Sequence, residues 1–293
     1  MDEDEIKARA IALYDRYTHG SHDRRRFLID MTRLVGSTAA AQALIASIAA
    51  DPAAAAMIAE DDKRLDARMV HWKGAGGRQL FGYMAIPKKH VKKPAAVLVV
   101  HENRGLQPYT KDVARRLAVA GFVGLAMDFL SPQGGTPAEE DKARQLIGAL
   151  DIAAATDDGV ATIRWLAAHR LLSGKVGVVG FCWGGAMANR LAANAGAALS
   201  AAVAFYGPTP PPAEAVRVKS AMLLHYAGTD DRVNAGAGAW VEALRSAQVD
   251  VRRFDYPGTQ HAFHNDTSAA RYDAEAAALS WERTLDFLRQ NLA

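Results

Sequence analysis

The chain has 293 residues, of which 50% are hydrophobic and 23% are charged, the composition of an ordinary globular protein with a substantial core. The formal net charge is only +3 and is spread along the chain, so it does not indicate a nucleic-acid-binding protein. The single cysteine excludes an intramolecular disulfide and a cysteine-based metal cluster, and no apolar run is long enough to span a membrane as a helix.

Residues 1–65 form a distinct N-terminal region. Residues 6–17 place apolar side chains on one face of a helix. Residues 22–28 resemble a twin-arginine export motif, and the alanine-rich stretch 37–59 follows them. One interpretation is a cleaved signal of a periplasmic protein. We favour a helical extension of a cytoplasmic protein, because this region is weakly apolar, carries Arg33, Gln42 and Asp51, and lacks a sharp cleavage site.

Residues 66–293 form the second predicted domain, in which short apolar segments alternate with helical ones. The predicted strands are 69–72, 79–86, 95–100, 122–127, 175–181, 199–206, 221–227 and 249–256. The predicted helices are 110–120, 137–150, 156–169, 185–194, 238–247 and 269–291. The first two strands predict a hairpin. The alternation that follows predicts an α/β fold with a mostly parallel sheet and helices on both faces.

The strongest motif is Gly180-Phe181-Cys182-Trp183-Gly184, which follows a predicted strand and precedes a predicted helix. In this strand–turn–helix context, Gly-x-Cys-x-Gly is typical of the nucleophile elbow of an α/β-hydrolase fold. The turn is tight and needs small neighbours, which the two glycines provide. The start of the following helix favours a negative charge on the nucleophile and on an oxyanion. We therefore predict that Cys182 is a catalytic nucleophile rather than a buried structural cysteine.

A nucleophilic thiol needs a base and an acid that orients the base. Asp230 and Asp231 both follow the strand 221–227, and we favour Asp230 as the acid, with Asp231 as the alternative. We predict that His261, in a loop between the last strand and the last helix, is the base.

The other histidines have simpler interpretations. We expect His264 either to contact the site residues without touching the substrate or to lie on the surface. We expect His225 to be a core residue within an apolar strand. A metal site made of His261, His264 and Glu102 is conceivable, but no metal-binding motif supports it. We expect neither a metal nor another cofactor.

Glu102 comes directly after the apolar strand 95–100. A buried carboxylate is unfavourable unless it has a partner or a catalytic task. We predict a catalytic role for Glu102, and the alternative is a structural ion pair with Arg104.

Together these motifs make residues 69–290 similar to the dienelactone hydrolase (carboxymethylenebutenolidase) family of the α/β-hydrolase superfamily. The matching segments are 101–105, 180–185, 205–207, 227–230 and 260–263. The resemblance implies a Cys-His-Asp triad of Cys182, His261 and Asp230, with Glu102 beside the thiol to help form the thiolate. It also implies an oxyanion hole made of the backbone N–H groups of Trp183 and Asn103.

The sequence departs from that family in the residues expected to bind the substrate. The resemblance implies two arginines that hold the carboxylate of dienelactone, one after strand 122–127 and one after the histidine. The chain has no arginine at either place. We expect the substrate instead to contact Arg104, Trp183 and Tyr206.

The sequence thus predicts a hydrolase that cleaves a small-molecule ester or lactone through an acyl-cysteine intermediate. A thioesterase or an organophosphate-type hydrolase with the same triad is one alternative, since substrate choice depends on the loops. A non-catalytic binding protein on this fold is another. We expect no nucleic-acid partner and no membrane association; the oligomeric state stays open, with a homodimer among the options.

Overall fold

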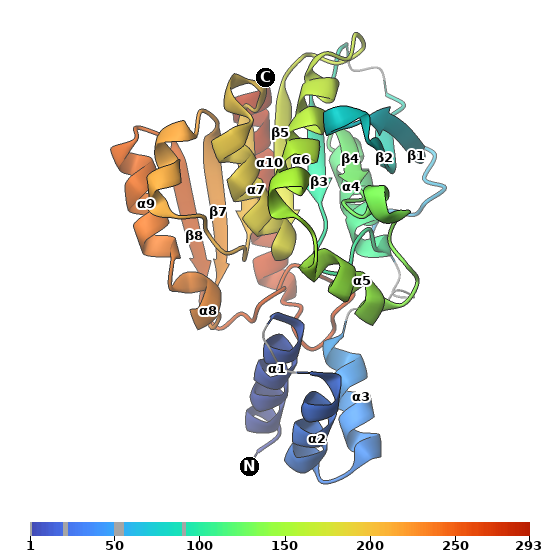
Figure 1. Ribbon diagram of the computed structural model, residues 1–293, viewed down its shortest axis with the longest axis vertical. Coiled ribbons are helices and arrows are strands. Elements are labelled where there is room, and N and C mark those ends of the chain that lie inside the picture. The colour runs from blue at the N-terminus through green and yellow to red at the C-terminus, as the bar shows by residue number, and fades with distance from the viewer. Residues whose placement is uncertain (1, 20–22, 50–55, 90–91) are drawn as a thin grey trace.

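The computed structural model describes residues 2–19, 23–49, 56–89 and 92–293. In this part of the chain an eight-stranded sheet is enclosed by helices, and three further helices lie together beneath it in the view of Figure 1. The strand order is β1-β2-β4-β3-β5-β6-β7-β8. The strands are β1 Leu65–Lys73, β2 Gln79–Pro87, β3 Ala96–Val100, β4 Val123–Met127, β5 Val176–Phe181, β6 Ala201–Phe205, β7 Ala221–Ala227 and β8 Val251–Tyr256.

The sheet is parallel from β4 through β8, while β1 and β2 form an antiparallel hairpin that joins β4. This arrangement confirms the predicted α/β-hydrolase fold with a mostly parallel sheet. The hairpin is longer than predicted, because β1 starts four residues before the expected position 69.

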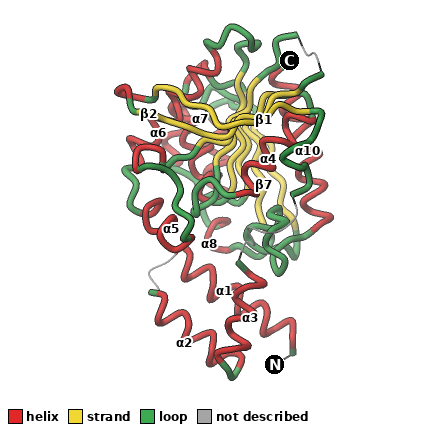
Figure 2. Tube along the Cα trace, turned by 90° about the vertical axis from the view of Figure 1, so that its right-hand side faces the viewer, coloured by secondary structure: helices red, strands yellow, loops and turns green. Residues whose placement is uncertain are grey.

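Helices cover both faces of the sheet, because the central strands are apolar on both sides. Alternate residues of β3 enter two different core clusters, as the two-residue period of a strand requires. One cluster contains residues of α6 (Ile152–Ala167), α7 (Trp183–Asn194) and α9 (Ala237–Ser246). The other contains residues of α4 (Pro108–Val119) and α10 (Ala274–Leu292). Figure 2 shows the twisted sheet between these helices.

The helices α1 (Glu3–His19), α2 (Arg24–Val35) and α3 (Thr38–Ile48) precede β1 and are called here the three-helix unit. They share a small core of their own, made of Ala10, Ile11, Tyr14, Tyr17, Phe27, Met31, Ala41 and Ile48. The arginines of the export-like motif lie in the first turn of α2, and part of the alanine-rich stretch forms α3. Residues 50–55 of that stretch lie outside the described residues. No helix of the described residues is long and apolar enough to cross a membrane.

Two predicted helices begin elsewhere. The helix predicted over 137–150 is the shorter α5 (Glu140–Gly148), whose N-cap is Glu139. The helix predicted from 156 begins at Ile152, because the carboxylate of Asp151 caps its first turn.

The last helix starts at Ala274, five residues later than predicted, and is capped by Asp273. The residues before it are held by α3 instead. The Ser268 hydroxyl donates to the carbonyl of Ile48 at 2.6 Å. The N–H of Ala270 donates to the carbonyl of Ser47 at 2.9 Å. The segment between His261 and α10 is therefore a loop fixed against the three-helix unit.

Candidate active site

Cys182 lies at the turn between β5 and α7, with φ 57° and ψ −114°. This conformation is strained for a residue with a side chain, and the surroundings stabilise it: the N–H of Cys182 donates to the carbonyl of Phe205 at 3.0 Å. A Cβ at Gly180 would overlap the carbonyl of Gly184, and a Cβ at Gly184 would overlap that of Val100. Glycine is required at both positions because backbone passes this close to the turn.

Asp230 and His261 form a buried pair. Oδ2 of Asp230 lies 2.5 Å from Nδ1 of His261, and both side chains are at most 7% exposed. Asp230 follows β7 and is the N-cap of α8 (Asp231–Asn234), where its Oδ1 accepts from the N–H of Val233 at 3.3 Å. Asp231 is the first residue of α8 and is exposed. Of the two aspartates the sequence offers, the one that contacts the histidine is Asp230.

His261 interacts with both Cys182 and Asp230. Burial lowers the pKa of His261, but the charge of Cys182 and hydrogen bonds to Asp230 and Cys182 outweigh burial and raise the pKa to about 10. Burial raises the pKa of Asp230, and the hydrogen bond and positive charge of His261 bring it below its ordinary value. His261 therefore lies between Asp230 and Cys182 and is hydrogen-bonded to both.

Glu102 lies just beyond the end of β3. Its Oε2 accepts a hydrogen bond from Nδ2 of Asn265 at 2.9 Å, whereas its Oε1 is buried with no donor among the described residues. The sequence left open an ion pair with Arg104. The Arg104 guanidinium instead contacts the hydroxyl of Tyr14 and, at 3.2 Å, the carboxylate of Glu140.

Two buried phenols lie within electrostatic reach of the Glu102 carboxylate. Burial is the main reason why the pKa values of Tyr109 and Tyr206 lie well above the ordinary value, and the charge of Glu102 adds to it in both cases. The charge of Cys182 also raises the pKa of Tyr206. Tyr206 is thus within electrostatic reach of both the thiol and the glutamate, and its ring centroid is 5.1 Å from that of His261.

A cavity of about 330 Å³ opens onto Cys182. Among the residues predicted for the oxyanion hole and the substrate, Trp183 and Asn103 line it, but Arg104 and Tyr206 do not. Trp183 is the first residue of α7, where a backbone N–H has no partner within the helix. Its indole stacks on the ring of His101, with centroids 5.5 Å apart.

Sequence analysis missed several residues of this cavity. Arg144 comes from α5, Arg232 from α8, and Thr18 from α1 of the three-helix unit; the remaining lining residues are Ile147, Gly148, Ala186 and Pro208. None of these residues belongs to a recognisable motif. Only the fold brings them to the cysteine.

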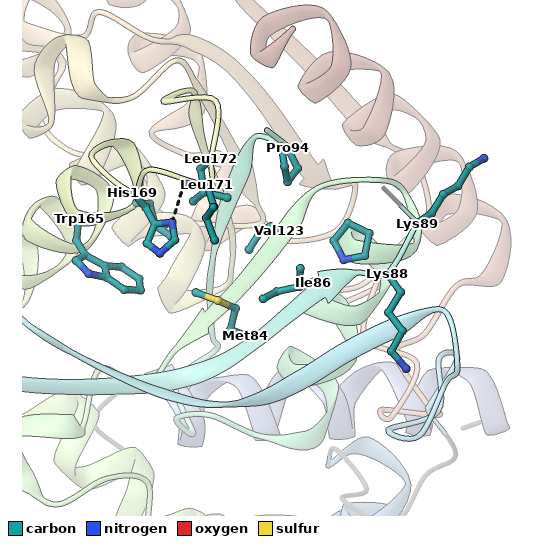
Figure 3. Close-up of a pocket in the computed structure, with 12 residues that line it drawn as sticks. Met84, Ile86, Lys88, Lys89, Pro94, Val123, Trp165, His169, Leu171 and Leu172 are labelled. Carbon is teal, nitrogen blue, oxygen red and sulfur yellow. Dashed lines mark hydrogen bonds between the residues drawn. The ribbon is translucent and has the colours of Figure 1, made fainter. Parts of the chain in front are cut away.

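A second cavity, of about 320 Å³, lies away from this site (Figure 3). Its lining includes Met84, Ile86, Val123 and Trp165. Val123 is the first residue of β4, whereas Cys182 follows the last residue of β5, so the two cavities lie at opposite ends of the parallel strands. The second cavity contains none of the predicted site residues.

His264 and His225 are both buried. His264 is 1% exposed, which corrects the expectation that it could lie on the surface, and its Nδ1 lies 2.6 Å from the hydroxyl of Tyr109. His225 is in the core, as predicted, between the hydroxyls of Tyr256 and Thr284. Burial lowers the pKa of each, to about 3 for His225. Within the described residues, no group of three or more His, Cys, Asp or Glu side chains is arranged to hold a metal ion.

Comparisons with known proteins show which family this chain resembles. Residues 80–292 match the family model described as "Dienelactone hydrolase family". A Yersinia pestis protein named "Putative carboxymethylenebutenolidase" is 31% identical over 231 residues, which cover 73% of this chain and 85% of the relative.

Solved structures share the fold. The dienelactone hydrolase-like promiscuous phosphotriesterase P91 from metagenomic libraries has a TM-score of 0.69 at 27% identity, and the match covers 78% of this chain and all of P91 (100%). The dienelactone hydrolase of Anabaena variabilis has a TM-score of 0.61 at 24% identity, with 78% of this chain and 100% of that chain covered.

Proposed function

The chain belongs to the dienelactone hydrolase family and is a hydrolase of ester or lactone bonds, and on that premise we propose that it works through an acyl-cysteine intermediate on Cys182. The observation that carries the proposal is the Asp230–His261 hydrogen bond of 2.5 Å, with the other side of the histidine hydrogen-bonded to Cys182. The acid is hydrogen-bonded to the base and the base to the nucleophile, which is the arrangement that covalent catalysis requires.

The first half of the reaction forms the acyl-enzyme. The Cys182 thiolate attacks the carbonyl carbon of the ester, and the carbonyl electron pair moves to the oxygen. The N–H groups of Trp183 and Asn103 stabilise this oxyanion at the start of α7 and after β3. When the tetrahedral intermediate collapses, the C–O bond breaks and the leaving alkoxide takes the proton from His261. The product of this half is a thioester of Cys182.

The second half hydrolyses the thioester. His261, now neutral, accepts a proton from water as the water attacks the thioester carbonyl. The same two N–H groups stabilise the second oxyanion. Its collapse breaks the C–S bond, releases the carboxylic acid and restores the thiolate and the imidazolium. Asp230 holds the imidazole in one tautomer and stabilises its charge throughout.

We assign Glu102 the task of helping to form the thiolate when substrate enters. Its Oε1 is buried without a donor among the described residues, an unfavourable state for a purely structural carboxylate. Its charge and that of Cys182 both act on Tyr206, so the same phenol is within electrostatic reach of both groups.

The charge of the cavity favours a substrate that carries an anionic group. Arg144 and Arg232 line it, and they take the place of the family's missing arginines from other positions in the chain. Guanidinium groups bind carboxylates in preference to neutral groups. The similarity to P91, which is named a promiscuous phosphotriesterase, makes phosphotriester hydrolysis the second candidate activity.

A hydrolysis screen of the purified protein tests these proposals. It compares lactones, aryl esters with and without a carboxylate, thioesters and phosphotriesters, each with the wild type and Cys182→Ala. We expect turnover of an ester or lactone that Cys182→Ala abolishes. Activity that survives in Cys182→Ala would refute the mechanism. Failure to hydrolyse any substrate would favour a binding protein on this fold.

For its setting, we propose a cytoplasmic enzyme that acts on a small molecule, without nucleic-acid or membrane partners. The export-like arginines support this, since they belong to a helix with its own N-cap, and Arg24 pairs with Asp141 of α5 at 2.8 Å. Cell fractionation of a C-terminally tagged full chain tests the location. A shortened protein in the periplasm would contradict it.

A further inference from the structure

The three-helix unit is an addition to the domain that the relatives share. The family model begins at residue 80. The solved structure of P91 is covered completely (100%), yet the match spans only 78% of this chain. The family model therefore does not describe what the unit does. In Figure 1 it lies at the end of the domain where α5 and α8 are found, and both of these helices supply residues to the cavity of Cys182.

The end of α1 contacts the loop that supplies one predicted oxyanion donor. Nδ2 of Asn103 donates to the carbonyl of Thr18 at 3.1 Å. The guanidinium of Arg104 hydrogen bonds to the hydroxyl of Tyr14, one turn earlier in α1. These contacts join residues 85 and 90 positions apart in the sequence, and they fix α1 directly against the loop after β3.

The same helix is held against α5. The hydroxyl of Tyr17 donates to Asp141 at 2.6 Å, and Arg144 lies over the Tyr17 ring at 4.3 Å. Arg144 also donates to the carbonyl of Tyr17 at 3.3 Å. Because Arg144 and Thr18 both line the cavity of Cys182, this contact closes one side of that cavity with residues of two separate elements.

A third set of contacts reaches the loop after His261. Besides the two hydrogen bonds that α3 makes to this loop, Arg271 pairs with Asp15 of α1 at 3.5 Å and lies over the Tyr14 ring at 5.2 Å. The unit thus touches the loop of Asn103, the helix of Arg144 and the loop of His261. These contacts are concentrated on the segments that carry the site residues, which favours a role for the unit in the active site.

We propose that α1 forms part of the active site, with Thr18 as a specificity-determining residue. Thr18 forms a wall of the cavity that opens onto Cys182, and it limits the size of the substrate's acyl group there. Thr18 is buried at 7% exposure, and its hydroxyl donates to the carbonyl of Tyr14. The hydrogen bond of the hydroxyl to Tyr14 holds the Thr18 side chain against α1, and the hydrogen bond from Asn103 to the Thr18 carbonyl holds its backbone against the loop after β3. The inference rests on the proposed function in so far as it names an acyl group as the occupant of the cavity. The shape of the cavity does not depend on that function.

The first experiment measures kcat/KM for esters of increasing acyl length. Thr18→Trp narrows the cavity, and we expect the ratio of long-chain to short-chain kcat/KM to fall about tenfold or more, as for other pockets that discriminate by size. Thr18→Ala widens it and raises the ratio. The matched control is Thr38→Trp, at an exposed position of α3, which leaves the ratio unchanged. An unchanged ratio in both Thr18 variants would overturn the inference.

The second experiment does not depend on ester hydrolysis. Cys182 is the only cysteine of the chain, so alkylation reports on this site alone. We expect Thr18→Trp to slow a bulky N-aryl maleimide about tenfold more than it slows iodoacetamide, with no such difference in Thr38→Trp. If the wild type cleaves no ester but this difference appears, the proposed function fails and the wall at Thr18 stands. Equal slowing of both reagents by Thr18→Trp would refute the wall.

Discussion

Replacing Asp230 with asparagine isolates the hydrogen bond on which the proposed mechanism depends. The new side chain keeps an oxygen that can accept from the N–H of Val233, so α8 keeps its N-cap. What changes is the group 2.5 Å from Nδ1 of His261. An amide carries no charge to stabilise the imidazolium, and its NH₂ group can face a ring nitrogen only in the wrong tautomer.

The expected loss is large. In a Ser-His-Asp triad the same substitution lowers kcat about 10⁴-fold. A thiol is a stronger acid than a hydroxyl and depends less on its base, so we expect Asp230→Asn to lower kcat/KM about 10²- to 10³-fold. The loss of one charge-assisted hydrogen bond should reduce the free energy of unfolding by about 2 kcal/mol.

The pH dependence gives an independent check. Asp230 helps to raise the pKa of His261 from 6.5 to about 10, and the active imidazolium–thiolate form is lost as the pH rises through that pKa. Removing the carboxylate lowers this pKa, so the basic limb of kcat/KM should move to lower pH in Asp230→Asn. The raised pKa of His261 also contributes to the free energy of unfolding. This contribution is complete at a pH below the pKa of the histidine in the unfolded chain, and it is lost as the pH rises towards 10.

Asp231→Asn is the matched control, because Asp231 is the neighbouring residue and is exposed. We expect it to change kcat/KM less than about twofold. Steady-state kinetics from pH 5 to 10 on both variants, with urea unfolding to check the fold, make the comparison. Near-wild-type activity in Asp230→Asn together with a large loss in Asp231→Asn would show that the acid has been assigned to the wrong residue.

The other predictions concern Glu102, the elbow glycine and the nucleophile. Glu102→Gln should lower kcat/KM about a hundredfold or more and alter the acidic limb of the pH–rate profile, with near-normal thermal stability; a stable variant with wild-type kinetics would make Glu102 structural. Gly184→Ala places a Cβ 2.6 Å from the carbonyl oxygen of His101 and should reduce the free energy of unfolding by about 3 kcal/mol, whereas Gly238→Ala, with open space around it, should not; equal urea midpoints would contradict this. Cys182→Ser should keep a small residual activity at most, because a hydroxyl is hard to deprotonate; wild-type rates would exclude a thiolate mechanism.

The features that the sequence predicted well are local ones. The strand, turn and helix around Cys182 lie within one short segment, and the glycines that the turn requires are adjacent to it. The hydrophobic pattern of the parallel strands depends only on burial of both faces. These features predicted the sheet and the elbow before any tertiary contact was known.

The choice between Asp230 and Asp231 shows where local information ends. Both follow the same strand, and sequence spacing only favoured the first. The structure makes Asp230 the N-cap, which has a non-helical backbone with φ −97° and ψ 70°, while Asp231 begins the helix and is exposed. One residue of difference in where α8 starts therefore decides which carboxylate contacts His261. The ends of short helices are the feature that sequence patterns locate least accurately.

The walls of the cavity depend on contacts that no sequence pattern encodes. The residues proposed for the chemistry sit at the ends of parallel strands, where the fold itself brings them together. Thr18, Arg144 and Arg232 come from three different helices, and their approach depends on how those helices pack. The sequence predicts that Arg104 contacts the substrate in place of the two missing arginines, yet its guanidinium contacts Tyr14 and Glu140. Motifs therefore predict the residues proposed for the chemistry, whereas the cavity walls, including Thr18 of α1, depend on how the helices pack.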